Sequence, residues 1–371
     1  MIVQGSLIME EEPKEEGHSR HEKNHFDNAS QWYPKVSEYT FATKFISLSK
    51  IQCEVISKTR QNGRMIGSMY NFTEDKEERK KILQMDPVQM LQEDERIVLK
   101  ELEETIDHHL QDYKNGAFVR LDTRSPKDAV LNSKLVKEII TEKIKQNPIK
   151  DKFSMECATS DSIIYWDSVS EACRVTSGAQ AVELLTSSNR VSEDITLGLL
   201  SHGEGIKIVI REWENIQPHL EFRVFIRNRE ITGITQYHKG LYIKKVVDNL
   251  ELVEELITEA FNKIKNIDIS PDHCYTADFV LITDGNTFTS ARLIEINDPP
   301  PTAGTSLFDW DDENDRNLIL NGPKSIRVYK EPISWEDQQK QSTLHPPLLK
   351  LIDQLRGRIP AEKESNNCVI C

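Results

Sequence analysis

The sequence predicts an α+β fold, because helical and strand-like segments follow one another in mixed order. Apolar residues recur at helical spacing between residues 99 and 110. Two apolar runs of strand length, residues 275–282 and 289–296, flank the sequence Asp-Gly-Asn and predict an antiparallel hairpin. No internal repeat is present that would indicate a solenoid instead.

The chain has 371 residues and a formal net charge of −14, from 47 Lys and Arg against 61 Asp and Glu. Its length allows about two domains. The acidic excess argues against a general binder of nucleic acid or anionic membranes, although a local basic site for a nucleotide stays open. No apolar run approaches the roughly 20 residues of a membrane span, and no secretory leader is evident. We therefore expect a cytoplasmic protein that binds no nucleic acid.

Composition and spacing predict the first elements. Residues 1–28 are charged, lack an apolar period and are expected to form a disordered tail. Residues 40–55 are rich in Phe, Ile and Thr and predict a strand, whereas the charged residues 74–81 predict a surface excursion. The helix over residues 99–110 is expected to be capped by Gly116.

A strand, a turn and two helices are predicted next. Residues 117–121 are an apolar run interrupted by one arginine, which predicts a strand, and residues 123–129 predict a turn into a helix. Residues 132–150 predict a basic amphipathic helix, and residues 179–185 predict a helix that stops at Ser-Ser-Asn. The remaining predictions are strands at 206–213, 220–226 and 231–236, a helix at 250–265, the hairpin, and a last helix at 347–356.

The cysteines suggest reduced thiols and one modification signal. Four of them are scattered through the chain with neither metal-ligand spacing nor a disulfide pattern. The last four residues, Cys368 to Cys371, have the C-a-a-X form of a prenylation signal, although a terminal Cys is an unusual last residue. An unmodified tail is the alternative. A single prenyl chain at Cys368 would give reversible membrane association.

The predicted hairpin carries polar residues that could bind a metal. Glu295 and Asn297 are two positions apart, so their side chains share one face of a strand. Asp278, on the partner strand, lies across from that face if the turn holds an even number of residues. Oxygen ligands of this kind suit Mg²⁺, which usually completes its shell with phosphate oxygens. A solvent-facing polar side of the sheet is the alternative.

Cationic residues occur within or beside apolar strands. Arg120, Arg211 and Arg223 lie in such strands, and each needs an anionic partner if it is buried. That partner is either a phosphate or a structural carboxylate such as Glu221. Lys127 lies at the start of a helix, where an anion can also bind. The chain has no P-loop motif and no Gly-rich Rossmann motif, so these nucleotide sites are not predicted.

Several short motifs, in their order along the chain, resemble the cell division cycle protein 123 family. The order is kept from about Trp32 to Trp310, and the ordered combination is more specific than any single motif. The motifs are Gln-Trp-Tyr-Pro at 31–34, Phe-Val-Arg-Leu at 118–121, Ser-Pro-Lys-Asp-Ala at 125–129, Ile-Arg-Glu-Trp at 210–213, Glu-Phe-Arg-Val-Phe at 221–225, Asp-Phe-Val at 278–280 and Leu-Ile-Glu-Ile-Asn at 293–297.

The resemblance implies an ATP-grasp-like fold, in which two lobes with mixed or antiparallel sheets enclose a cleft for ATP and Mg²⁺. It also implies an assembly chaperone that joins the subunits of translation initiation factor 2 through the gamma subunit. We expect a monomer with one bilobal unit at residues 29–340 and a helical insertion at about 132–150. Residues 341–371 are expected to form a C-terminal helix and a polar tail.

The resemblance also assigns roles to individual residues. Arg120 stands where the family has a phosphate-contacting Lys, and Arg211 and Arg223 match basic positions near the nucleotide. The metal-binding side of the family matches Asp278, Glu295 and Asn297. The family's partner-facing start matches Trp32, Tyr33 and Pro34. These assignments are what the resemblance implies for the site.

Four departures from the family pattern bear on the expected function. Arg120 replaces a Lys, Glu295 replaces an Asp, Ile282 stands at a second Asp position and Thr186 at a Lys position. These changes affect the expected turnover of ATP more than the fold, so we expect binding rather than catalysis. The alternatives are an ATP-dependent ligase or phosphotransferase of the ATP-grasp type, or a nucleotide-free interaction protein anchored by a prenylated Cys368.

Overall fold

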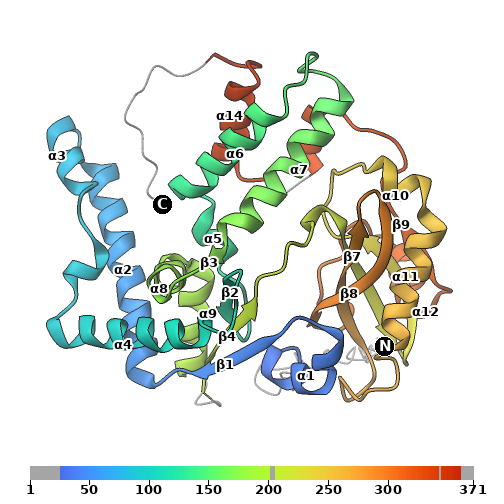
Figure 1. The fold of residues 1–371 in the computed structure, drawn as a ribbon, viewed down its shortest axis with the longest axis horizontal. Coiled ribbons are helices and arrows are strands. Elements are labelled where there is room, and N and C mark those ends of the chain that lie inside the picture. The colour runs from blue at the N-terminus through green and yellow to red at the C-terminus, as the bar shows by residue number, and fades with distance from the viewer. Residues whose placement is uncertain (1–25, 201–204, 342–343, 361–371) are drawn as a thin grey trace, which may run out of the picture.

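The computed structural model describes residues 26–200, 205–341 and 344–360. The expected N-terminal tail up to residue 25 and the prenylation signal at Cys368 lie outside these ranges. Within them, the chain forms two sheets and a set of surrounding helices (Figure 1). No helix in this part of the chain is long and apolar enough to cross a membrane.

The strands form a four-stranded sheet and a five-stranded sheet. The smaller sheet has the order β1-β4-β2-β3 and is antiparallel throughout. The larger has the order β8-β7-β5-β6-β9, and only the β6–β9 pair is parallel. The strands are β1 Thr43–Ser47, β2 Ala117–Leu121, β3 Arg174–Val175, β4 Lys207–Glu212, β5 Glu221–Arg227, β6 Glu230–Gln236, β7 Tyr275–Asp284, β8 Thr287–Asn297 and β9 Ser325–Arg327.

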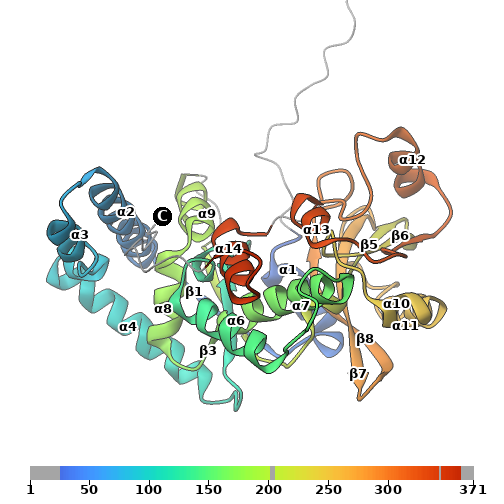
Figure 2. The same cartoon turned by 90° about the horizontal axis from the view of Figure 1, so that it is seen from above.

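Each sheet has its own hydrophobic core and its own helices. Helices α2, α4, α8 and α9 pack with the smaller sheet, and α1, α10 and α11 pack with the larger one. The two lobes lie at opposite ends of the long axis (Figures 1 and 2). These helices are α1 Ala29–Val36, α2 Lys50–Phe72, α4 Glu93–Leu110, α8 Gly178–Ser187, α9 Asn189–Leu200, α10 Lys244–Asp248 and α11 Leu250–Asn262.

A third core belongs to a group of helices between the lobes. It joins α6, α7, α13 and α14, and α5 leads into it (Figure 2). These are α5 Lys127–Val130, α6 Lys134–Gln146, α7 Met155–Ala172, α13 Trp335–Gln341 and α14 Pro346–Leu355. The remaining short elements are α3 Lys76–Ile82, α12 Glu313–Asn321 and the 3-10 helices Ser37–Tyr39, Pro87–Met90 and Pro218–Leu220.

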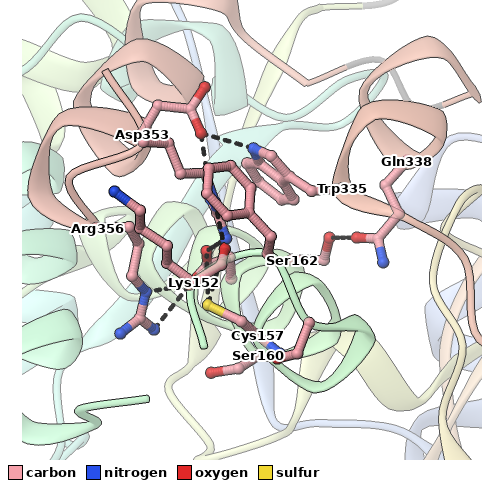
Figure 3. A network of polar contacts seen from close by, with 12 residues as sticks. Lys152, Cys157, Ser160, Ser162, Trp335, Gln338, Asp353 and Arg356 are labelled. Carbon is pink, nitrogen blue, oxygen red and sulfur yellow. Dashed lines mark hydrogen bonds and ion pairs between the residues drawn. The ribbon is translucent and has the colours of Figure 1, made fainter. Parts of the chain in front are cut away.

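A polar network holds the C-terminal segment against α7 (Figure 3). Asp161 is fully buried and accepts hydrogen bonds from Arg356 Nε at 2.8 Å and from Arg358 Nη2 at 2.6 Å. Arg358 Nη1 also donates to Asp353, which accepts from the Trp335 indole at 2.7 Å. The last helix is therefore part of the folded unit, because buried charges on two elements need each other as partners.

The structure corrects two predictions of secondary structure, those for residues 40–55 and for Gly116, and adds detail to a third. Only the middle of residues 40–55 is a strand, because Ser49 caps α2 and forms a capping box with Gln52. The predicted surface excursion at 74–81 is mostly exposed, as expected, and forms most of the short helix α3. Gly116 does not cap the preceding helix, which ends at Leu110. Its φ of +80° makes the turn into β2, where a Cβ would lie 2.3 Å from the Val175 carbonyl oxygen.

The hairpin of β7 and β8 has the predicted arrangement. Gly285, with a φ of +52°, lies in its turn. Asp278 pairs directly with Glu295, and Thr276 pairs with Asn297. A β-bulge between Asp278 and Phe279 shifts the register just beyond this pair. A second bulge lies between Ile282 and Thr283. Alternation predicts that the two acidic residues share a face, and the two bulges bring them directly opposite each other.

Candidate functional site

A cleft of about 680 Å³ lies where both sheets and the central helices meet. Its volume is typical of a site for a small organic ligand. It brings together all four predicted cations and one of the predicted metal ligands. These lining residues are Arg120 on β2, Lys127 on α5, Arg211 on β4, Arg223 on β5 and Glu295 on β8.

Arg120 connects the two sheets through an ion pair with Glu295. Its guanidinium also donates to the carbonyls of Leu121 at 2.9 Å and Thr123 at 2.8 Å, so its own lobe fixes its orientation. Burial would raise the pKa of Glu295, but Arg120 and Lys127 outweigh burial and lower it to about 2. Glu295 is therefore ionised at neutral pH, with a protein cation as its partner.

Arg223 binds the second carboxylate of the site. It donates to both oxygens of Asp278, at 2.9 and 2.8 Å, in a bidentate pair. Asn297 also donates its amide to one of these oxygens, at 2.8 Å. Asp278 has no solvent exposure. Burial raises the pKa of Asp278, while the Asp278 carboxylate keeps Arg223 charged.

The three predicted metal ligands are thus close together but already engaged. Both oxygens of Asp278 and one oxygen of Glu295 accept hydrogen bonds from guanidiniums. Asn297 turns its amide nitrogen, not its oxygen, toward Asp278. In the described part of the chain no group of three His, Cys, Asp or Glu residues could hold a metal ion. The donors have the chemistry that Mg²⁺ prefers, but their present arrangement does not fit the ion.

Arg211 has a partly structural role. Its Nη1 donates to the Ile294 carbonyl at 2.6 Å, and its guanidinium lies 5.7 Å from the Trp32 ring and 5.8 Å from the Phe41 ring. Burial, with the nearby charge of Arg120, lowers the pKa of Arg211 to about 10. Arg211 therefore stays charged at neutral pH and ties β4 to β8 at the wall of the cleft.

Lys127 is available to a ligand. No described protein atom forms a hydrogen bond with its ammonium group, which lies 6.0 Å from the Tyr237 ring and is accessible from the cleft. Burial would lower the pKa of Lys127, but the acidic groups of Glu221 and Tyr237 outweigh it and raise the pKa to about 12. A charged ammonium without a hydrogen-bonded partner is suited to binding an anion.

The cleft also contains residues that the sequence did not single out. Arg190 and Lys239 line it, and no hydrogen bond from either side chain to another described residue is found. Trp166 stacks on His238 with ring centroids 3.8 Å apart. Lys239 follows a predicted strand end, which is a weak signal for a site. Arg190 and Trp166 lie on helices far away in sequence, so no local pattern could have indicated them.

Glu221 is the third carboxylate of the cleft. It is 6% exposed, and within the described ranges no hydrogen bond reaches its side chain. Burial raises the pKa of Glu221 to about 8 despite the nearby charge of Lys127. The sequence predicted that Glu221 could be the structural partner of an arginine. It lies instead among the cleft residues, close enough to Lys127 to interact electrostatically.

The predicted partner-binding segment lies in α1 and does not line the cleft, although the Trp32 ring lies 5.7 Å from the guanidinium of Arg211 at the cleft wall. Trp32 is 1% exposed and packs in the core of the larger lobe. The Tyr33 hydroxyl accepts a hydrogen bond from the Thr43 backbone at 3.0 Å, and only Pro34 is exposed. Partner binding by this segment stays a prediction, but the Trp32 side chain is part of the packing of the fold.

The chain is similar to one known protein family and to individual proteins named for the assembly of translation initiation factor eIF2 or for the cell division cycle. The model of the D123 family matches residues 32–369. A Botryotinia fuckeliana protein named translation initiation factor eIF2 assembly protein is 26% identical over 310 residues, which cover 78% of this chain and 64% of that protein. Cell division cycle protein 123 from Yarrowia lipolytica is 28% identical over 149 residues, covering 39% and 38%. The chain thus matches less than two thirds of the length of these relatives.

A solved structure supports the fold. Cdc123 from Schizosaccharomyces pombe superposes with a TM-score of 0.52 over 81% of this chain and 94% of that chain, at 17% sequence identity. At this identity the likeness concerns the fold alone. The α+β, ATP-grasp-like architecture with antiparallel and mixed sheets, expected from the family resemblance, is confirmed.

Proposed function

Because the chain belongs to the D123 family, we propose that it is an assembly factor for translation initiation factor 2 that binds ATP in the cleft between its lobes. The proposed partner is the gamma subunit of that factor. The observation that carries the nucleotide part is the ammonium of Lys127, which is charged and open to a cleft of about 680 Å³ without a hydrogen-bonded partner.

The cleft offers both positive charge and apolar surface, which a nucleotide requires for its phosphates and its base. Lys127, Arg190 and Lys239 offer positive charge to phosphates without giving up a hydrogen bond in the protein. Aromatic and aliphatic side chains, among them Phe118 and Trp213, supply the apolar surface that a base needs. Both lobes contribute lining residues, so a bound nucleotide would hold the lobes together and order the surface presented to a protein partner.

The family resemblance implies magnesium as a second cofactor, but the proposed function does not depend on it, because guanidiniums engage the expected ligands. Asp278, Glu295 and Asn297 are the residues that would hold the magnesium ion. The bound ion would neutralise part of the negative charge of the phosphates. It would have to compete with Arg120 and Arg223 for the same oxygens. We propose binding rather than turnover of ATP for the same reason, because these guanidiniums already occupy the acidic groups that a ligase or phosphotransferase would use.

Titration of the full chain with ATP tests the nucleotide part. Lys127→Gln should weaken binding by about tenfold or more, as expected for the loss of one charge-assisted contact. Lys244→Gln is the matched control, because Lys244 lies on α10 and pairs with Asp248 at 2.6 Å outside the cleft. Absence of ATP binding by the folded wild type would refute the proposal, and so would equal affinities of the two variants.

Two further measurements address the remaining parts. Release of ADP across carboxylate substrates would favour the ligase alternative over a binding protein. Capture of the isolated gamma subunit by the purified chain tests the proposed partner. The assembly role fails if the gamma subunit does not bind in either the presence or the absence of ATP.

A further inference from the structure

We infer that the guanidinium of Arg120, paired with Glu295, takes the place of a metal ion in the cleft, so that this chain binds nucleotide phosphates without requiring Mg²⁺. The inference rests on the proposed nucleotide site and specifies how that site neutralises charge. It starts from the finding that the candidate metal ligands are engaged by protein cations rather than left open.

The Arg120–Glu295 pair is built into the fold rather than formed by two mobile surface side chains. The side chains are 11% and 20% exposed. Two main-chain carbonyls hold the guanidinium from the β2 side, at 2.9 and 2.8 Å, and leave Nη1 for the carboxylate on β8. Because these contacts orient the guanidinium in advance, little conformational entropy remains to be lost when it pairs. A metal ion that bound the Glu295 carboxylate would break its preorganised contact with Arg120, which joins the two lobes.

Asp278 is closed to a metal for a different reason. Its bidentate contact with Arg223 uses both oxygens, and the side chain has no exposed surface. Arg223 also donates to the Gly304 carbonyl at 2.9 Å, which fixes it on the side away from the carboxylate. Mg²⁺ gives up its waters reluctantly and needs near-octahedral geometry. A buried carboxylate that is already chelated by a guanidinium provides neither the space nor the free oxygens.

The local charge balance points the same way. Six Lys and Arg side chains line the cleft, and they balance five lining carboxylates and the buried Asp278. Three of these cations have no side-chain hydrogen bond to another described residue: Lys127, Arg190 and Lys239. A divalent cation would enter a region without excess negative charge to attract it. Polyphosphate anions would enter it favourably, and guanidinium groups bind phosphate oxygens in the same forked geometry as carboxylates. The cations of the chain can therefore do the charge neutralisation that Mg²⁺ does elsewhere.

Calorimetric titration of the full chain with ATP, in excess EDTA and in saturating Mg²⁺, tests the inference. For the wild type we expect dissociation constants that agree within about threefold. Arg120→Gln should weaken binding in EDTA by about tenfold or more, and Mg²⁺ should restore part of it, because the variant removes one cation and frees Glu295. Arg124→Gln is the control. It removes a charge four positions further along the chain, but Arg124 pairs with Asp194 and Glu193 and does not line the cleft.

Wild-type binding that appears only with Mg²⁺ would overturn the inference and leave the proposed nucleotide function intact. No binding of ATP in either condition would instead remove the proposed function. If Arg120→Gln does not fold, Arg120→Lys keeps the charge without the fork and should show a smaller change in the same direction. Electron paramagnetic resonance with Mn²⁺ alone gives a readout without nucleotide. An ordered stoichiometric Mn²⁺ site in the wild type would also overturn the inference.

Discussion

Replacing Asp161 with asparagine tests how strongly the C-terminal segment is held to the fold. The Asp161 carboxylate is fully buried, and the side chains of Arg356 and Arg358 that it binds are each 5% exposed. Asparagine keeps the shape of the side chain and removes its charge. Two buried guanidiniums then lose the carboxylate that they share, while their own desolvation is unchanged.

The size of the effect follows from this burial. Removing one partner of a buried ion pair costs about 3–5 kcal/mol, because the remaining charge is left uncompensated. Asp353 still accepts a hydrogen bond from Arg358 at 3.1 Å, and it is 17% exposed, so part of the compensation survives. We therefore expect the free energy of unfolding to fall by about 3 kcal/mol, at the lower end of that range.

Urea unfolding followed by circular dichroism measures this change, and trypsin provides a local readout at Arg356 and Arg358. Cleavage there should become faster in Asp161→Asn, because the segment opens more often. Glu138→Gln is the control. It breaks an exposed pair between Lys134 and Glu138 on α6, which is worth only about 0.3–0.5 kcal/mol. A loss below about 1 kcal/mol with unchanged cleavage would show that the network does not anchor the segment.

Two further predictions concern the core and the cleft. Trp32→Ala should cost about 3–5 kcal/mol in urea unfolding, because Trp32 is 1% exposed, whereas Pro34→Ala should change stability little. Equal effects would place Trp32 on the surface instead. Glu221 has a pKa raised by burial from 4.5 in the unfolded chain to about 8, so its contribution to stability falls as pH rises between these values. Glu221→Gln should therefore gain stability relative to wild type between pH 5 and pH 8, and a constant difference would contradict this.

Local patterns predicted the hairpin and its polar face well. The alternation of side chains along β8 places Glu295 and Asn297 on one face, and the even turn places Asp278 on the same face of the sheet. The direct pairing of Asp278 with Glu295 depends on two β-bulges that the sequence did not predict. The strand at Ala117–Leu121 was recognisable because its apolar run matches its alternating burial. Where a cap decides the element, as at Ser49, composition alone was misleading, because a side-chain hydrogen bond ends the loop and starts a helix.

The partners of the charged residues could not be predicted in the same way. The sequence indicated that Arg120, Arg211 and Arg223 need anionic partners if they are buried, because unpaired buried guanidiniums are costly. It could not tell a ligand phosphate from a protein carboxylate. The structure shows that Arg120 and Arg223 pair with Glu295 and Asp278, while Lys127 keeps an ammonium without a hydrogen bond.

The sequence by itself determined the α+β class, the positions of most strands along the chain and the charged residues that they carry. These features depend on periodicity and turn chemistry over a few residues. Only the tertiary structure decided which of those charges meet. Arg120 and Glu295 are 175 positions apart and lie on different sheets. Contacts at such separation depend on how the two lobes pack, and no local pattern carries that information.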